Sequence, residues 1–112
     1  MYNRSMDDEK LTRILQELRA GLAQRLGDRL EAVYLYGSRA RGDARADSDI
    51  DVLVVLRGDF DYFKTLDQIS DLAWTLSLEN DVVIAQVLVS KDKYSQNDTP
   101  FLINVHREAV LI

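Results

Sequence analysis

The segment Ile50–Leu56 restricts the possible folds more than any other part of the sequence. It reads Ile-Asp-Val-Leu-Val-Val-Leu, so every residue after Asp51 is apolar. A strand with one solvated face would alternate apolar and polar residues, whereas a continuous apolar run is typical of a strand buried on both faces. We therefore expect Ile50–Leu56 to be a central strand of a sheet that is covered on both sides.

Apolar spacing and turn residues predict the remaining elements. Residues 7–26 and 62–77 carry apolar side chains at steps of three and four, which predicts two amphipathic helices. Residues 32–36, with β-branched and aromatic side chains, and residues 81–89, with many β-branched ones, predict two more strands. Thr99 and Pro100 are expected to open a short last helix. This order predicts one α/β domain over residues 1–112, a small mixed sheet flanked by helices.

Two features of this scheme concern the packing of the chain. Trp74 lies amid the apolar stripe of the second long helix, which favours a place in the core. The last residues, from Arg107 to Ile112, end apolar. They are expected either to return as an edge strand or to contact a partner, and the sequence does not choose between these two.

Composition excludes several classes of protein. The chain has 112 residues, no cysteine and a net charge of −5. Without cysteine there is no disulfide framework and no thiolate metal site. No apolar run approaches the ~20 residues that cross a bilayer, so we expect a cytoplasmic protein without membrane association. Non-specific binding of nucleic acid needs a basic surface, so the acidic balance makes a nucleic-acid partner an unfavoured prediction.

Asp49 and Asp51 are the strongest candidates for chemistry. Residues two apart on a strand point to the same face, so both carboxylates project together from the start of the central strand. Two such groups repel each other unless a cation neutralises them. Mg2+ prefers oxygen ligands and is usually held by one or two carboxylates together with substrate phosphates. Asp49 and Asp51 are therefore predicted to hold Mg2+.

The turn that follows residues 32–36 is suited to phosphate. Gly37 permits a sharp turn and a close approach of the backbone to a ligand. Ser38 offers a hydroxyl group, and Ser38 and Arg39 offer backbone N–H groups at the start of a short helix. The guanidinium of Arg39 suits a polyphosphate, so Gly37, Ser38 and Arg39 are the predicted nucleotide-binding residues. Arg41 and Arg45 are expected to be solvated or paired with nearby aspartates.

The spacing of these residues resembles that of a known family. Gly37-Ser38, ten further residues and then Asp49-x-Asp51 match the signature of the DNA polymerase β-like nucleotidyltransferases. The chain as a whole resembles the minimal nucleotidyltransferases (MNT), many of which are antitoxins of a HEPN toxin, an RNase. The resemblance implies transfer of AMP from ATP, with Mg2+, to a tyrosine of the toxin. It also implies an oligomer with that toxin.

Members of this family normally have a third carboxylate on a neighbouring strand. In residues 81–89 the best candidate is Asp81, at the predicted start of the strand, where it would share a face with Val83 and Ala85. If the required position is nearer Ala85, the site has two carboxylates only. Three functions then stay open: protein adenylylation, neutralisation of a toxin by binding alone, and nucleotidyl transfer to tRNA or a small molecule.

Overall fold

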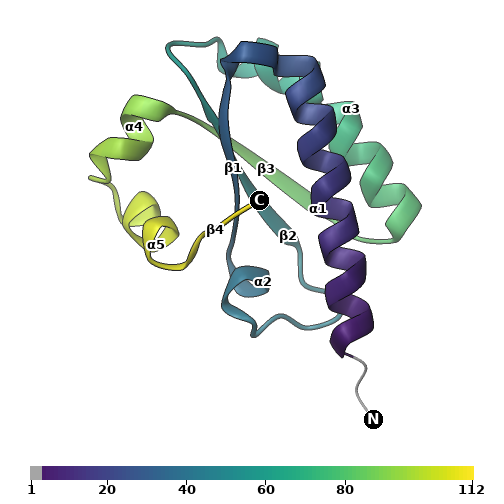
Figure 1. Ribbon diagram of the computed structural model, residues 1–112. Helices are drawn as coiled ribbons and strands as arrows, with labels where there is room; N and C mark the ends of the chain where they lie inside the picture. The colour runs from purple at the N-terminus through teal and green to yellow at the C-terminus, as the bar shows by residue number, and fades with distance from the viewer. Residues whose placement is uncertain (1–3) are drawn as a thin grey trace.

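The computed structural model describes residues 4–112 and has the predicted α/β architecture (Figure 1). A 3-10 turn at Gly27–Arg29 follows the first helix. The other elements, in chain order, are α1 (Arg4–Leu26), β1 (Leu30–Tyr36), α2 (Ser38–Arg41), β2 (Ile50–Leu56), α3 (Tyr62–Asn80), β3 (Ile84–Ser90), α4 (Lys91–Gln96), α5 (Pro100–Glu108) and β4 (Val110–Leu111).

The four strands form one mixed sheet in the order β3-β2-β1-β4. β2 runs antiparallel to β1 and parallel to β3, while β4 pairs antiparallel with β1. β2 therefore has a hydrogen-bonded neighbour on each side. The prediction that Ile50–Leu56 is a central strand is confirmed.

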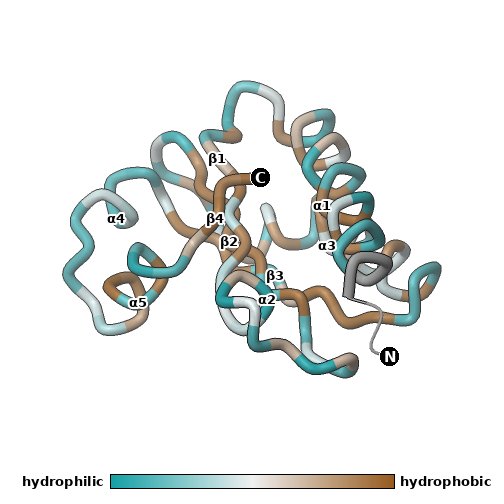
Figure 2. Tube along the Cα trace, turned by 60° about the horizontal axis from the view of Figure 1, so that its bottom comes forward, coloured by the Kyte–Doolittle hydropathy of each residue, from teal (hydrophilic) through white to brown (hydrophobic). Residues whose placement is uncertain are grey.

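Alternate residues of β2 feed two separate hydrophobic clusters. Ile50, Val52 and Val54 belong to the cluster that includes the apolar stripe of α1. Leu53 and Val55 pack on the opposite side of the sheet, where Val105 of α5 is buried. Figure 1 shows α1 and α3 covering one face and α4 and α5 lying on the other, and Figure 2 shows the strands as hydrophobic segments between them. Burial on both faces is the physical reason for the unbroken apolar run in β2.

The end of α3 differs from the prediction. The helix continues to Asn80, and Asp81 is its C-cap residue in the left-handed conformation, with φ 54°. The next strand begins only at Ile84, so the expectation that Asp81 starts a strand is wrong. Asp81 also lies exposed at the surface. Asp is among the few non-glycine residues that adopt this conformation readily, which explains why the helix ends there.

The polar segment after β3 contains the short helix α4. Ser90 caps this helix, and its hydroxyl oxygen accepts a hydrogen bond from the N–H of Lys93 at 3.2 Å. An N-cap serine satisfies a backbone donor that has no partner within the helix. The cap therefore allows a short, polar helix where composition alone favours a loop.

The structure also settles the two packing questions. Trp74 is 66% exposed, so the prediction that it lies in the core is wrong. It is adjacent in sequence to the buried Ala73, and one residue turns a helix by about 100°, away from the sheet. The C-terminal residues return as β4, with Leu111 opposite Tyr34 and Val110 opposite Leu35. Among the described residues, no helix is both long and apolar enough to cross a membrane.

Candidate active site

The pairing of β1 with β2 brings the two halves of the motif together. Tyr36, the last residue of β1, lies opposite Asp51, the second residue of β2. Gly37 follows Tyr36 directly and has φ 76° and ψ −158°. A Cβ atom on Gly37 would overlap Oδ2 of Asp51. Two features therefore favour glycine here: its backbone conformation, and the close approach of Asp51, whose carboxylate a Cβ atom would displace.

The helix α2 begins immediately after this contact. The carbonyl oxygen of Gly37 accepts hydrogen bonds from the N–H groups of Ala40 and Arg41, both at 3.1 Å. Gly42 ends the helix in the left-handed conformation. The first N–H groups of any helix lack partners within it, and here they belong to Ser38 and Arg39. The predicted phosphate-binding turn and Asp51 are thus neighbours in space.

Asp51 has an unfavourable electrostatic environment for a carboxylate. Burial raises the pKa of Asp51 above its usual range, and the negative charges of Asp49 and Glu108 raise the same pKa further. The cation of Arg41 acts in the opposite direction. Asp49 is exposed, just before β2. In the described part of the chain, neither Asp49 nor Asp51 forms a salt bridge with a basic side chain.

Tyr36, opposite Asp51 in the sheet, is a neutral neighbour of this carboxylate. Its ring meets that of Phe101 edge to face, with 5.5 Å between the ring centroids. Burial, with a contribution from Asp51, raises the pKa of Tyr36 to about 12. The phenol therefore remains protonated at neutral pH and cannot serve as a base there.

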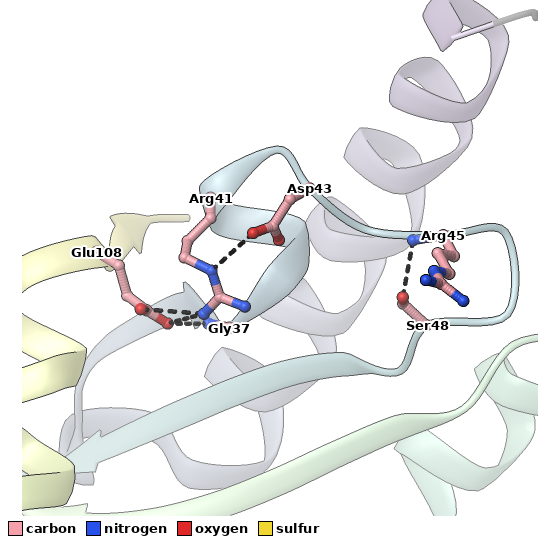
Figure 3. Close-up of polar contacts among 6 residues, drawn as sticks. All are labelled: Gly37, Arg41, Asp43, Arg45, Ser48 and Glu108. Carbon is pink, nitrogen blue, oxygen red and sulfur yellow. Dashed lines mark hydrogen bonds and ion pairs between the residues drawn. The ribbon is translucent and has the colours of Figure 1, made fainter.

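Arg39 contacts the motif loop itself. Its Nη2 donates to the carbonyl oxygens of Ser48 at 3.0 Å and Ala46 at 3.3 Å. The hydroxyl oxygen of Ser48 in turn accepts a hydrogen bond from the N–H of Arg45 at 2.9 Å, as Figure 3 shows. These contacts fix the segment that leads into Asp49. In this structure Arg39 therefore holds the loop, and its predicted contact with a nucleotide stays a prediction.

Asp81 is not among the charges that act on Asp51. In the parallel register of β2 and β3, the residue opposite Asp51 is Ala85. Within residues 4–112, no group of three His, Cys, Asp or Glu side chains is arranged to hold a metal ion. The structure thus brings together Gly37, Ser38 and the two motif aspartates, and leaves Asp81 at the end of α3.

Glu108 is a residue of this site that the sequence analysis missed. It is the last residue of α5, and its Oε2 accepts a hydrogen bond from the N–H of Gly37 at 2.5 Å (Figure 3). Both carboxylate oxygens also lie 3.2 Å from Nη1 of Arg41, whose Nε donates to Asp43 at 3.2 Å. For Arg41 the sequence left solvation and pairing with a nearby aspartate open, and the structure shows the pair with Asp43. The link to Glu108 had no local signal, because it depends on where the C-terminus returns.

Comparison with known proteins places this geometry in a family. The family described as "Polymerase beta, Nucleotidyltransferase" matches residues 9–109. The protein MJ0604 of Methanocaldococcus jannaschii, named as a candidate protein adenylyltransferase, is 34% identical over 91 residues. The aligned region spans 81% of this chain and 82% of the relative.

Solved structures share the fold. A candidate nucleotidyltransferase from Sulfolobus solfataricus superposes with a TM-score of 0.68 and 22% identity, over 98% of this chain and 87% of that one. A chain in the complex of tri-AMPylated Shewanella oneidensis HEPN toxin with MNT antitoxin gives a TM-score of 0.52 and 16% identity. That match covers 91% of this chain and 70% of the other. Since the family match includes the Gly-Ser turn, both motif aspartates and nearly all of the described elements, the chain belongs to the polymerase β family of nucleotidyltransferases.

Proposed function

We propose that this chain is a Mg2+-dependent adenylyltransferase that transfers AMP from ATP to a tyrosine of a cognate HEPN toxin. The observation that carries the proposal is the contact of Gly37 with Asp51, which joins a turn suited to phosphate to a carboxylate suited to a metal. Support for a protein acceptor comes from MJ0604, whose name gives that activity. Support for the partner comes from the structural similarity to an MNT antitoxin complex.

The donor set at Asp49 and Asp51 fits Mg2+. Both ligands are carboxylates, their charges repel each other, and no basic side chain of residues 4–112 forms a salt bridge with either. Asp49 and Asp51 would therefore hold the ion, together with phosphate oxygens of the nucleotide. When bound, Mg2+ supplies charge neutralisation for the triphosphate and the leaving group.

The contribution of the chain itself is positioning. Ser38 and the N–H groups at the start of α2 would bind phosphate oxygens, and the fixed loop before β2 would orient Asp49. In the reaction the acceptor hydroxyl oxygen forms a bond to the α-phosphorus. The bond between that phosphorus and the pyrophosphate oxygen breaks, pyrophosphate leaves and the hydroxyl proton is released. Asp81 is left out of this proposal, because it lies at the end of α3 and not opposite Asp51.

A second candidate function is neutralisation of the toxin by binding without catalysis. The observation that favours it is Ala85, which stands opposite Asp51 where a neighbouring strand could have carried a third acid. A site with two carboxylates binds metal more weakly than one with three. Both functions require a complex with the toxin, so formation of the complex does not separate them.

Transfer of label separates the two functions. The chain would be incubated with α-32P-ATP, Mg2+ and a purified HEPN toxin, and compared with the variants Asp49→Asn and Asp51→Asn. Asp47→Asn is the matched control, since Asp47 is an exposed carboxylate of the same loop. We expect label on toxin tyrosine with the native chain and the control, and none with the other two variants.

The outcomes differ for each function. Equal RNase inhibition by the native chain and by the Asp49→Asn and Asp51→Asn variants, without label on the toxin, would establish binding alone and refute the enzyme. Labelled tRNA in the absence of labelled toxin would instead assign a nucleic-acid acceptor. The net charge of −5 counts against that acceptor.

A further inference from the structure

The carboxylate of Glu108 lies next to the turn formed by Gly37 and Ser38. Only 19% of this side chain is exposed, and its oxygens contact the N–H of Gly37 and the guanidinium of Arg41. We propose that Glu108 is a positioning residue, which fixes the Gly37–Ser38 turn and the side chain of Arg41 so that the turn can receive a triphosphate. This inference rests on the proposed function and adds a residue from the far end of the chain to its site.

The turn needs such a support because its backbone is unusual. Gly37 has a positive φ, and glycine has more conformational freedom than any other residue. The N–H of Gly37 follows the last residue of β1 and is bound by Glu108 at 2.5 Å. A hydrogen bond from an amide to an ionised carboxylate is among the stronger ones in proteins. Without it, the N–H of Gly37 would lose this partner, and the turn that directs the first N–H groups of α2 would have one hydrogen bond fewer to hold it.

Glu108 is itself held at both ends. Before it, Leu102 and Val105 of α5 are buried. After it, β4 pairs with β1, and the N–H of Ile112 donates to the carbonyl oxygen of Val33 at 2.9 Å. The C-terminal segment is thereby tied to the same strand that ends at the turn. These contacts on both sides of Glu108 suit it to position the turn, because a positioning side chain needs support from its surroundings.

The contacts of Glu108 distinguish positioning from metal binding. Both of its oxygens face Arg41, which offsets the negative charge, and one also accepts from Gly37. Together with Asp49 and Asp51 it does not form a metal-binding group of three in the described residues. We therefore assign Glu108 to the protein side of the turn and not to the ion.

The variants Glu108→Gln and Glu108→Ala test this assignment, with Glu17→Gln as a control on an exposed glutamate of α1. Glutamine keeps an oxygen that can accept from Gly37, whereas alanine removes it. We expect Glu108→Ala to raise the KM for ATP about tenfold or more, with a smaller change in kcat, and Glu108→Gln to restore part of the loss. Circular dichroism and thermal unfolding of Glu108→Gln would show that the fold is retained.

Two measurements do not depend on transfer activity. In the protein without nucleotide, the amide resonance of Gly37 should shift and its hydrogen exchange should accelerate in Glu108→Ala, while Glu17→Gln matches the native chain. Mn2+ affinity without nucleotide should stay within about twofold of native in Glu108→Gln and fall in Asp51→Asn.

The results separate this inference from the proposed function. A native chain that labels no acceptor refutes the function, while the amide and Mn2+ measurements still decide the role of Glu108. A native KM for ATP and an unchanged Gly37 amide in Glu108→Ala would overturn the inference. Loss of Mn2+ binding in Glu108→Gln to the extent seen in Asp51→Asn would also overturn it, since Glu108 would then be a metal ligand.

Discussion

Gly37 and Asp51 approach each other so closely that a Cβ atom at residue 37 would force the carboxylate of Asp51 to move. Gly58 has a similar φ, 73° against 76°, but no atom lies within 4 Å of the place where its Cβ would stand. Alanine at Gly58 therefore measures the cost of a positive φ in the absence of a contact, whereas alanine at Gly37 adds the contact with Asp51 to a backbone conformation that is almost limited to glycine.

The Gly37→Ala variant should lose both stability and activity. Alanine at Gly58 bears only the strain of a positive φ, about 1 kcal/mol of unfolding free energy. At Gly37 the added Cβ also displaces Asp51, so we expect a larger loss of stability and a fall in transfer rate of about 100-fold. Urea unfolding and the labelling assay on both variants check this. Equal effects of Gly37→Ala and Gly58→Ala would contradict the role of the contact.

The Asp51→Asn variant should be more stable than the native chain in the absence of metal. The pKa of Asp51 is raised in the folded state by burial and then by Asp49 and Glu108, so the folded protein binds this proton more tightly than the unfolded chain. The stability linked to this group is fully present below the unfolded pKa and is lost as the pH rises through the folded value. Because Asp51 is only partly buried, solvent screens the repulsion, and at pH 7 we expect Asp51→Asn to gain less than about 1 kcal/mol.

Thermal unfolding with and without Mg2+ tests this account of Asp51. Between about pH 3 and pH 7 the native chain should lose stability relative to Asp51→Asn, because only the native chain releases this proton. Mg2+ should raise the Tm of the native chain more than that of the variant, since a ligand stabilises the state that binds it. A native chain that is more stable than Asp51→Asn at pH 7 without Mg2+ would show that the repulsion is absent.

The Arg39→Lys variant distinguishes a loop-holding arginine from a phosphate-binding one. Lysine keeps the positive charge, but its ammonium nitrogen lies closer to its own backbone than Nη2 of Arg39, the single atom that donates to the carbonyl oxygens of Ala46 and Ser48. If Arg39 holds the loop, Arg39→Lys should lower stability by about 1 kcal/mol and reduce kcat more than it changes the KM for ATP. Arg45→Lys is the control, on an exposed arginine of the same loop. A raised KM with unchanged stability would instead support the predicted contact with the nucleotide.

The predictable parts of this protein are those with a local physical cause. Ile50–Leu56 was predicted to the residue because burial on both faces demands a continuous apolar run. The closeness of Gly37 and Asp51 also has a local cause. The first half of the motif comes at the end of β1, the second half comes at the start of β2, and these two strands are neighbours in the sheet. Glu108 could not be found in this way. It is 71 residues from Gly37, and its position depends on the pairing of the last residues with β1.

The end of α3 was mispredicted for a different reason. Leu78 and Glu79 are good helix formers, so nothing in their composition ends the helix before Asn80. The helix ends at Asp81, its C-cap residue in the left-handed conformation. The sequence Asp81-Val82-Val83 gives no sign of this cap, because its two valines favour a strand. Boundary errors of three residues matter little for the fold. They matter greatly for a metal ligand, which must lie within a few tenths of an ångström of its place.

The position of Asp81 at the end of α3 bears on the third carboxylate of the site. Asp81→Asn should leave the transfer rate within about twofold of native, because Asp81 is exposed at a helix end and Ala85 is the residue opposite Asp51. Ala85→Asp would place a third carboxylate beside Asp51 on the parallel strand, so we expect Mg2+ affinity to rise by about tenfold and stability without metal to fall. Calorimetric titration of Mg2+ and the labelling assay, with Ala85→Asn as the uncharged control, measure both effects. A severe loss of Mg2+ binding in Asp81→Asn would contradict this and show that Asp81 is a metal ligand. The segment before β3 would then have to move toward Asp51 when the metal binds.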